Sequence, residues 1–116
     1  MATSTIPIDK TKTSISCSLG GTIYIYRDGD YVNIVTPQIS SLSFAAYETK
    51  NMGTLPAGCR PSVPDGNIAF PMPTGATGIV LRLLINNNGQ ISLYNSGSAL
   101  SDITIIRSSF NFYRGG

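Results

Sequence analysis

The chain contains no histidine and no tryptophan, and Glu48 is its only glutamate. Histidine is the commonest general base and the commonest metal ligand, so its absence removes the usual partner of a serine nucleophile and the usual metal site. Glu48 and five aspartates offer few carboxylate pairs, whereas glycoside hydrolysis needs two carboxyls across the scissile bond. We therefore expect no enzyme, no metal site and no cofactor, and a hydrolase ranks last among the functions.

Charge is also scarce. Only 12% of the residues are charged, the net charge is +2, and the eight basic residues are spread along the whole chain. No basic run exists to follow a phosphate backbone, so we expect no nucleic-acid binding. No apolar run approaches the roughly 20 residues of a membrane span, so we expect no membrane insertion. A low-charge surface suits packing against other protein chains or binding of neutral ligands such as sugars.

The chain has two cysteines, Cys17 and Cys59, which lie 42 positions apart and match no metal-ligand spacing. Their separation permits a disulfide, and the sequence leaves that pairing open. Two lone cysteines in a β-domain are more often small buried apolar residues.

What the chain has instead is serine, threonine and asparagine, with 12 glycines and 7 prolines. Short β-like runs alternate with turn signals, which is the pattern of an antiparallel β-sandwich or a jelly-roll-like head domain. We predict eight or nine strands and essentially no helix, because no segment keeps a helical period beyond two turns. Residues 1–12 read as a polar leader, either a linker or a strand that pairs late, and residues 13–116 as a single domain.

The strongest local prediction is a hairpin of residues 22–27 and 30–36, with Asp28-Gly29 as its turn. Its first strand alternates isoleucine on one face with tyrosine on the other. The tyrosines of this hairpin and of the last strand are interpreted as packing residues: Tyr24, Tyr26, Tyr31 and Tyr113.

Most of the irregular structure is expected at residues 48–66, and a second hairpin is expected at Asn88-Gly89. The other expected strands are 13–18, 38–47, 67–71, 79–85, 90–95 and 101–114, of which the last holds one or two strands. The run 79–85 is apolar apart from Arg82, which predicts a central strand covered on both sides. Arg82 then ends outside the domain, is buried against a carboxylate or carbonyls, or lies at an oligomer interface.

The stretch "TLPAGCRPSVP" (54–64) concentrates three prolines around Arg60 and Cys59. Proline fixes φ and extends the preceding residue, so the stretch is interpreted as a rigid crossover between strands. Arg60 would hydrogen-bond loop carbonyls or an aspartate, and Cys59 would point inward. Pro56, Cys59, Arg60 and Pro61 are therefore candidate structural residues, with ligand contact as the alternative.

Two aromatic residues are expected where strands run out into loops. Tyr47 is followed by Glu48, and Tyr94 is followed by Asn95. A ring beside a carboxylate or an amide can stack on a sugar and hydrogen-bond its hydroxyls. These four residues are the candidate saccharide site, and packing at the loop edge is the alternative.

The order of the segments resembles the C-terminal head domain of tail-fibre, baseplate and minor structural proteins from tailed phages. That family shows a loop of the form LP-x-G-Y/F-RP, a strand ending in FP, a tight hairpin and an aromatic-rich last strand. The matching residues are Leu55, Pro56, Gly58, Arg60, Pro61, Phe70, Pro71, Asn88, Gly89, Phe112 and Tyr113. Cys59 replaces the usual aromatic, and the resemblance covers roughly residues 20–114.

The resemblance implies a trimeric β-sandwich head at the tip of a virion tail, made in the host cytoplasm. Such heads assemble with other tail or baseplate proteins and commonly adhere to the host surface, often through a cell-wall saccharide. Two alternatives remain: a purely structural trimerisation or attachment module, and a free-standing bacterial carbohydrate-binding module. The family's ligand residues are not motif residues, so the resemblance brings no binding site with it.

Overall fold

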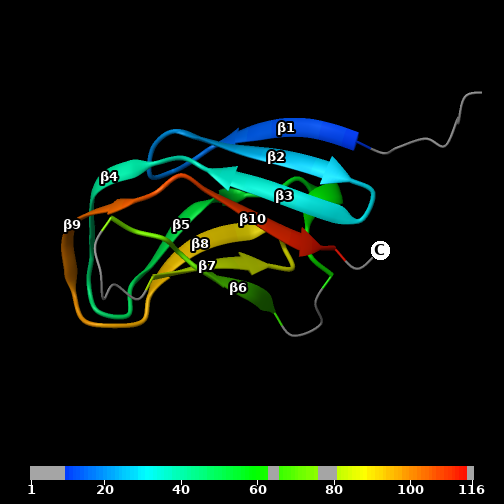
Figure 1. Cartoon of the computed structure of the whole chain (residues 1–116). Coiled ribbons are helices and arrows are strands. Elements are labelled where there is room, and N and C mark those ends of the chain that lie inside the picture. Colours follow the sequence, from blue (N-terminus) through cyan, green and yellow to red (C-terminus); the bar gives the residue numbers. More distant parts are fainter. Residues whose placement is uncertain (1–9, 63–65, 76–80, 115–116) are drawn as a thin grey trace, which may run out of the picture.

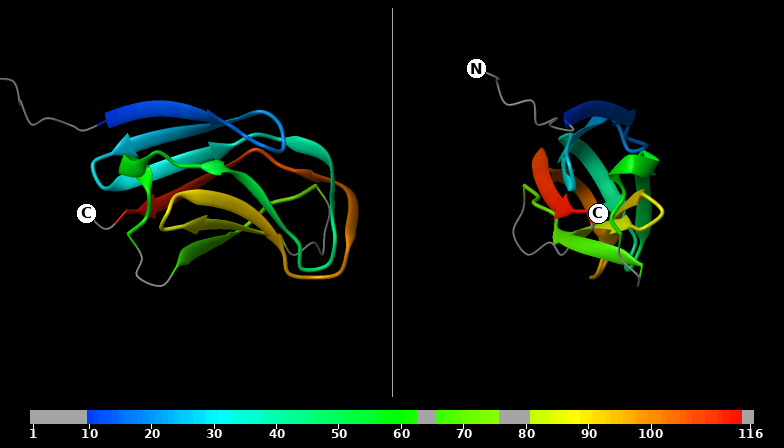
Figure 2. Two further views of the ribbon diagram at one scale, coloured as in Figure 1. Left: turned by 180° about the vertical axis from the view of Figure 1, so that it is seen from behind. Right: turned by 90° about the vertical axis from the view of Figure 1, so that its right-hand side faces the viewer.

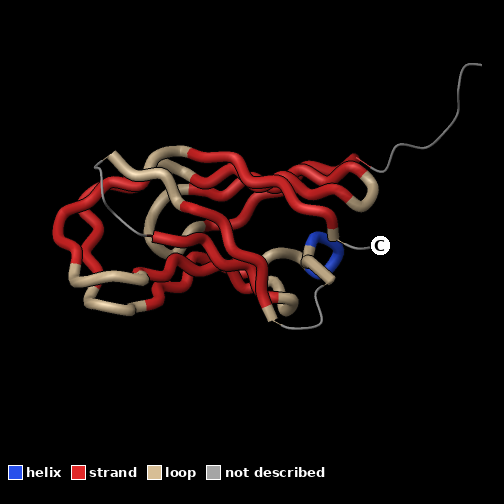
Figure 3. The backbone as a smooth tube through the Cα atoms, turned by 60° about the horizontal axis from the view of Figure 1, so that its bottom comes forward, coloured by secondary structure: helices blue, strands red, loops and turns tan. Residues whose placement is uncertain are grey.

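The computed structural model describes residues 10–62, 66–75 and 81–114, and these form an all-β fold (Figure 1). The strands are β1 (Lys10–Ser16), β2 (Thr22–Asp28), β3 (Tyr31–Thr36), β4 (Ile39–Phe44), β5 (Thr49–Thr54), β6 (Asn67–Pro71), β7 (Leu81–Asn86), β8 (Gln90–Asn95), β9 (Leu100–Ile105) and β10 (Ser108–Tyr113). The one helical element in these ranges is a single 3-10 turn, η1 (Ala57–Cys59) (Figure 3). The all-β prediction is confirmed, with ten strands where eight or nine were expected.

All strand pairs are antiparallel and form three sheets. Two have four strands, in the orders β1-β2-β3-β10 and β5-β8-β7-β6, and the third pairs β4 with β9. Figures 1 and 2 show the two larger sheets facing each other, with β4 and β9 at one end. From β3 onward the pairing is nested, because β3 pairs with β10, β4 with β9, β5 with β8 and β6 with β7. This nesting gives the sandwich a jelly-roll-like order.

The core lies between the facing sheets and follows from strand alternation. Ile23 and Ile25 on β2 and Val32 and Ile34 on β3 are fully or almost fully buried, and they face residues such as Leu83 on β7. Alternate residues on β2 and β3 point outward, since successive side chains of a strand lie on opposite faces. The hydrophobic alternation of the first hairpin therefore decides which tyrosines reach solvent.

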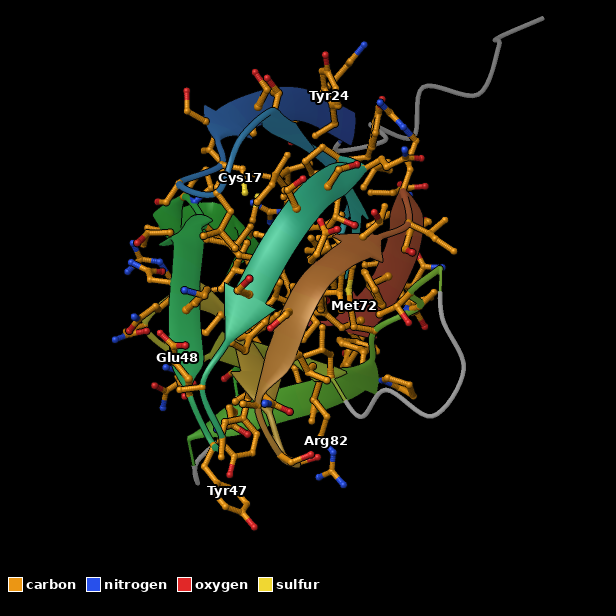
Figure 4. The ribbon with its side chains drawn as sticks, turned by 90° about the vertical axis from the view of Figure 1, so that its left-hand side faces the viewer. Cys17, Tyr24, Tyr47, Glu48, Met72 and Arg82 are labelled. Carbon is orange, nitrogen blue, oxygen red and sulfur yellow. The ribbon has the colours of Figure 1, made fainter. Side chains whose placement is uncertain are left out.

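Three sequence-based expectations about strands were wrong. β1 begins at Lys10, three residues before the expected strand 13–18, because the β2 strand beside it continues to Asp28 and pairs with it throughout. Strand β5 lies in the region expected to be irregular, and it is interrupted by a bulge between Asn51 and Gly53. β7 is interior in its sheet but buried on one face only, so Arg82 points into solvent (Figure 4). The first two residues of the expected strand 79–85, and residues 1–9 of the leader, lie outside the described residues.

Both predicted hairpins are present, with turns displaced from the expected residues. Asp28 pairs with Tyr31, so the first loop is Gly29-Asp30, and Gly29 has a φ of +62°. The second loop has three residues and ends at Gly89, with a φ of +91°. A Cβ at Gly89 would approach the Leu55 carbonyl oxygen to 2.8 Å, so this glycine also permits the crossover loop to pack against the hairpin.

The crossover loop that follows β5 is held in place by hydrogen bonds of its own residues Leu55 and Arg60. Arg60 Nε donates to the Leu55 carbonyl oxygen at 3.0 Å, and the Leu55 N–H donates to the Gly89 carbonyl at 2.8 Å. Pro61 and Cys59 are buried, and Cys59 and Cys17 are both free thiols. Arg60 therefore has a structural partner within its own loop.

Candidate functional site

The four residues predicted to bind a saccharide lie together at the end of the sandwich where β4 leads into β5 and β8 leads into β9. Thr49 pairs with Tyr94 in the β5–β8 ladder, and the Asn95 N–H donates to the Glu48 carbonyl oxygen at 2.9 Å. We call residues 45–48 and 95–98 the tip. The structure thus brings the predicted residues into one place, and their side chains decide whether a ligand can use them.

Asn95 is a buried structural residue. Asn95 is 1% exposed, and both polar atoms of its side chain form hydrogen bonds within the protein. Nδ2 donates to the carbonyl oxygens of Ala45 at 3.0 Å and Ser98 at 2.8 Å, and Oδ1 accepts from the Gly97 N–H at 3.1 Å. The amide therefore ties the two loops of the tip together and is closed to a ligand in this conformation.

Glu48 is likewise engaged within the tip. One carboxylate oxygen accepts from the Ala45 N–H at 2.7 Å, and the other lies 3.3 Å from Lys50 Nζ. The Ala45 hydrogen bond, followed by the Lys50 hydrogen bond, holds the pKa of Glu48 below its ordinary value of 4.5. The carboxylate is thus charged at neutral pH and committed to closing its own turn.

Tyr47 occupies the third position of that turn, since the Glu48 N–H donates to the Ala45 carbonyl at 3.2 Å. Its φ is +60°, a left-handed conformation that favours glycine or asparagine at this position. Its ring is 67% exposed and extends into solvent at one end of the molecule (Figure 4). The tip therefore presents a tyrosine ring whose neighbouring polar side chains already have partners.

Tyr94 and Arg82 are neighbours on the outer face of the sheet β5-β8-β7-β6, because they pair in the β7–β8 ladder. Tyr94 is half-buried and Arg82 is exposed. The same outward face carries mostly small or uncharged residues, among them Thr49, Asn51 and Ala69. The exposure of Arg82 excludes burial against a carboxylate or carbonyls, and it agrees with both other expectations, a side chain that ends outside the domain or lies at an oligomer interface.

The outer face of the other sheet, β1-β2-β3-β10, is different because it gathers exposed aromatic rings. We call its outward residues the tyrosine face, and its rings are Tyr24 (36% exposed), Tyr26 (39%), Tyr31 (66%) and Tyr113 (58%). They come from three strands and lie on the side opposite the core isoleucines. Figure 4 shows Tyr24 projecting outward from this sheet.

Strand register sets these side chains in rows across the sheet. One row runs Lys12, Tyr26, Asn33, Asn111 over β1, β2, β3 and β10. The next row places Asp28 beside Tyr31 and Tyr31 beside Tyr113. Directly opposite residues on neighbouring strands have Cβ atoms about 4.5–5.5 Å apart, so each row is continuous.

A groove of about 440 Å³ lies over these rows. It is lined by Thr11, Lys12, Tyr26, Arg27, Asp28, Tyr31, Val32, Asn33 and Asn111. Its walls thus combine aromatic rings with two amides and a few charged groups. This is the mixture that recognises sugars, since rings stack on the apolar faces of a pyranose and amides bond its hydroxyls.

The rings of Tyr31 and Tyr113, at one end of the face, are held in place by their mutual contact and by bonds between Arg114 and Asp30. Tyr31 and Tyr113 lie with their ring centroids 5.3 Å apart and their planes tilted by 55°. Directly after Tyr113, Arg114 donates to the Asp30 carboxylate at 3.2 Å, and its N–H donates to the Asp30 carbonyl at 2.7 Å. The end of β10 is therefore fastened to the β2–β3 turn, which fixes the two rings as one aromatic platform.

Sequence reasoning treated these tyrosines as packing residues, which the contact between Tyr31 and Tyr113 bears out, but it did not predict that all four share one exposed face. A signal was present, because Ile23 and Ile25 can enter the core only if Tyr24 and Tyr26 point away from it. The proximity of Tyr31 and Tyr113 had no such signal, since it depends on the pairing of β3 with a strand that follows 72 residues later.

The described parts of the chain bring no three His, Cys, Asp or Glu side chains together as a metal site, and they hold no helix able to cross a membrane. The site has aromatic, amide and hydroxyl groups, which suit reversible binding. No family model matches the chain, and no curated protein sequence matches it.

Proposed function

We propose that this chain is a saccharide-binding adhesion domain and that the tyrosine face is its binding surface. The observation that carries the proposal is the set of exposed rings on one side of one sheet, beside Asn33 and Asn111 in a common groove. Exposed aromatic rings are costly for a surface with no ligand, because a soluble protein normally limits its exposed apolar patches. Rigid rings on strands also bind with little loss of conformational entropy.

The biological setting we propose is the head of a phage tail fibre or baseplate protein. It rests on the ordered motifs that resemble that family and on the all-β sandwich, which agrees with it. In that setting the head is a homotrimer attached to other tail or baseplate proteins, and its ligand is a saccharide of the host cell surface.

Binding is tested on a glycan array and on purified bacterial cell-wall fractions, with wild type, Tyr31→Ala/Tyr113→Ala and Tyr47→Ala compared. Tyr47→Ala is the matched control, since it removes an equally exposed ring from the tip. We expect the double variant to lose roughly 30-fold or more in affinity, taking about 1 kcal/mol for each stacked ring. Unchanged binding by a folded double variant would refute the proposed surface.

A structural trimerisation module is the second candidate, and the outer face of β5-β8-β7-β6 favours it. That face is poor in charge and carries the exposed Arg82, and arginine is enriched at interfaces where lysine is depleted. Sedimentation equilibrium of the wild type and Arg82→Glu tests it. A trimer that persists in ~1 M salt, dissociates on Arg82→Glu and binds no glycan would favour the structural module over the adhesin.

A further inference from the structure

The groove of the tyrosine face contains a positive charge that the described protein does not neutralise. Lys12 Nζ lies 5.9 Å from the centroid of the Tyr24 ring and 5.7 Å from that of the Tyr26 ring. Neither of the ion pairs found among the described residues includes Lys12, since these join Glu48 to Lys50 and Asp30 to Arg114. The ammonium is therefore held against two rings, at the wall of the groove, by cation–π attraction.

The other charged groups of the groove do not pair with Lys12. The Arg27 side chain lies on the inward side of the sheet, since its register partners are Thr11 and Val32 and its Nη1 lies close to Gly58, and its Nε donates to the Gly29 carbonyl at 2.8 Å. Asp28 is the one carboxylate that lines the groove, and its register partner on β1 is Lys10, not Lys12. Among the described side chains, Lys12 is thus the one cation on the outward side of the groove, and it forms no ion pair there.

We infer that the saccharide bound by the tyrosine face is anionic, with its acidic group placed at Lys12 while its sugar rings stack on Tyr26 and Tyr31. The inference rests on the proposed function and names the ligand class for that same surface. A carboxylate of a uronic acid and a phosphodiester between sugar units share the required chemistry. An anion at this position would pair with the Lys12 ammonium without displacing the lysine stem from the rings.

The experiment compares wild type with Lys12→Met, Lys12→Arg and Asp28→Asn. Methionine keeps the apolar stem over the rings and removes the charge, whereas arginine keeps the charge. Asp28→Asn is the matched control that removes a charge of the opposite sign from the same groove. The probes are polygalacturonate, its carboxyl-reduced form, and bacterial cell-wall polysaccharide before and after cleavage of its phosphodiesters with hydrofluoric acid.

We expect the wild type to bind an anionic polymer better than its neutralised form, with an affinity that falls as salt rises. Lys12→Met should lower affinity for the anionic polymer roughly three- to fivefold, as expected for an exposed ion pair, and leave the neutral form unaffected. Lys12→Arg should retain the preference, and Asp28→Asn should keep or strengthen it. Loss of binding on carboxyl reduction identifies a uronic acid, and loss after hydrofluoric acid identifies a phosphodiester.

Equal binding of charged and neutralised polymers, or no effect of Lys12→Met, would overturn the inference. If that binding still depends on Tyr31 and Tyr113, the proposed function stands and only the anionic ligand class fails. If no saccharide binds, or if the Tyr31→Ala/Tyr113→Ala variant binds as well as wild type, the proposed function and the inference fall together.

Discussion

Two regions of this molecule expose tyrosine, and they achieve it in opposite ways. On the tyrosine face, Tyr26 and Tyr31 lie on regular strands, and their neighbours Asn33 and Asn111 line an open groove. Asn33 Oδ1 accepts from Ser109 Oγ at 2.6 Å, whereas the Asn33 Nδ2 and the Asn111 amide form no hydrogen bond among the described residues. At the tip, Tyr47 lies in a turn with a left-handed φ, and the polar groups around it are bonded to the protein itself. A ring beside a polar residue in sequence is therefore not sufficient for a sugar site, because the polar residue must also keep a donor or acceptor free.

The largest change in stability should come from removing the hydrogen bonds that Asn95 forms in the tip. Asn95→Ala removes a buried amide and leaves the Ser98 carbonyl and the Gly97 N–H without their partner, while the Ala45 carbonyl keeps only the Glu48 N–H as donor. We expect the free energy of unfolding to fall by about 3 kcal/mol, since each buried group left unpaired costs about 1–3 kcal/mol. Chemical denaturation measures it. Asn111→Ala is the comparison on the tyrosine face, where the exposed amide should cost little stability and should weaken glycan binding instead.

A stability loss of under ~0.5 kcal/mol for Asn95→Ala would show that water replaces the amide at low cost. The tip would then be a loosely held loop. The contrast with the tyrosine face would lose its physical basis, and Glu48 would return as a candidate ligand residue.

The second prediction concerns the extent of the tyrosine face. From Tyr113 through Tyr31 and Tyr26 to Tyr24, the rings follow a diagonal across three strands that is about 15–20 Å long, judged from standard strand spacings. One sugar ring cannot cover it. Affinity should therefore rise about tenfold between a disaccharide and a tetrasaccharide of the same polymer, since one further stacked ring contributes about 1–1.5 kcal/mol.

Isothermal titration with a length series checks this, and Tyr24→Ala supplies the control. That variant should bind the disaccharide normally and lose the gain from added units. An affinity that does not change with length would restrict the site to the Tyr31 and Tyr113 platform.

How far the sequence predicted these features depended on the strength of local alternation. The β2–β3 hairpin was predictable because isoleucine and tyrosine alternate without interruption. Strand β5 was not, because Met52 is its only buried residue and a bulge breaks its period before Gly53. The β4–β9 pair has two register irregularities, with Ser41 and Asp102 at positive φ, and β4 is shorter than the predicted strand 38–47.

The candidate site was also predictable only where local sequence patterns determine it. The sequence located the tip, since Tyr47 and Tyr94 were both expected where strands run out into loops, and the pairing of β5, which begins two residues after Tyr47, with β8 brings them to one end. It could not show that Asn95 is buried, because burial there depends on a loop that packs from 50 residues away. The tyrosine face combines residues from both ends of the chain, and only the β3–β10 register joins them.

Tyr47 should lower the free energy of unfolding, because its backbone has a left-handed φ. Glycine adopts a φ of +60° without steric penalty, whereas other L-residues pay about 1–2 kcal/mol there. Part of that gain is offset by the greater backbone entropy of glycine in the unfolded chain. Tyr47→Gly should therefore raise the free energy of unfolding by about 0.5–1 kcal/mol.

Tyr31→Gly is the opposite case, because Tyr31 lies in a regular strand where glycine weakens the ladder by about 0.5–1 kcal/mol. Thermal and denaturant unfolding of both variants under one condition measure the contrast. Two variants that change stability in the same direction would mean that the turn at Tyr47 is not strained.

The smallest effect concerns the acid range and the turn that Glu48 closes. The bond from the Ala45 N–H and the contact with Lys50 lower the pKa of Glu48 from its ordinary 4.5. A carboxyl with a lowered pKa in the folded state contributes stability above its unfolded pKa, and that contribution is lost as pH falls through the folded value. The melting temperature of wild type should therefore decline more steeply below about pH 4.5 than that of Glu48→Gln, with the two curves parallel near neutrality.

Asp102→Asn controls for the loss of one negative charge at an exposed position. If Glu48→Gln follows the wild-type acid profile, the carboxylate does not close the turn in solution, and the tip is held by Asn95 alone.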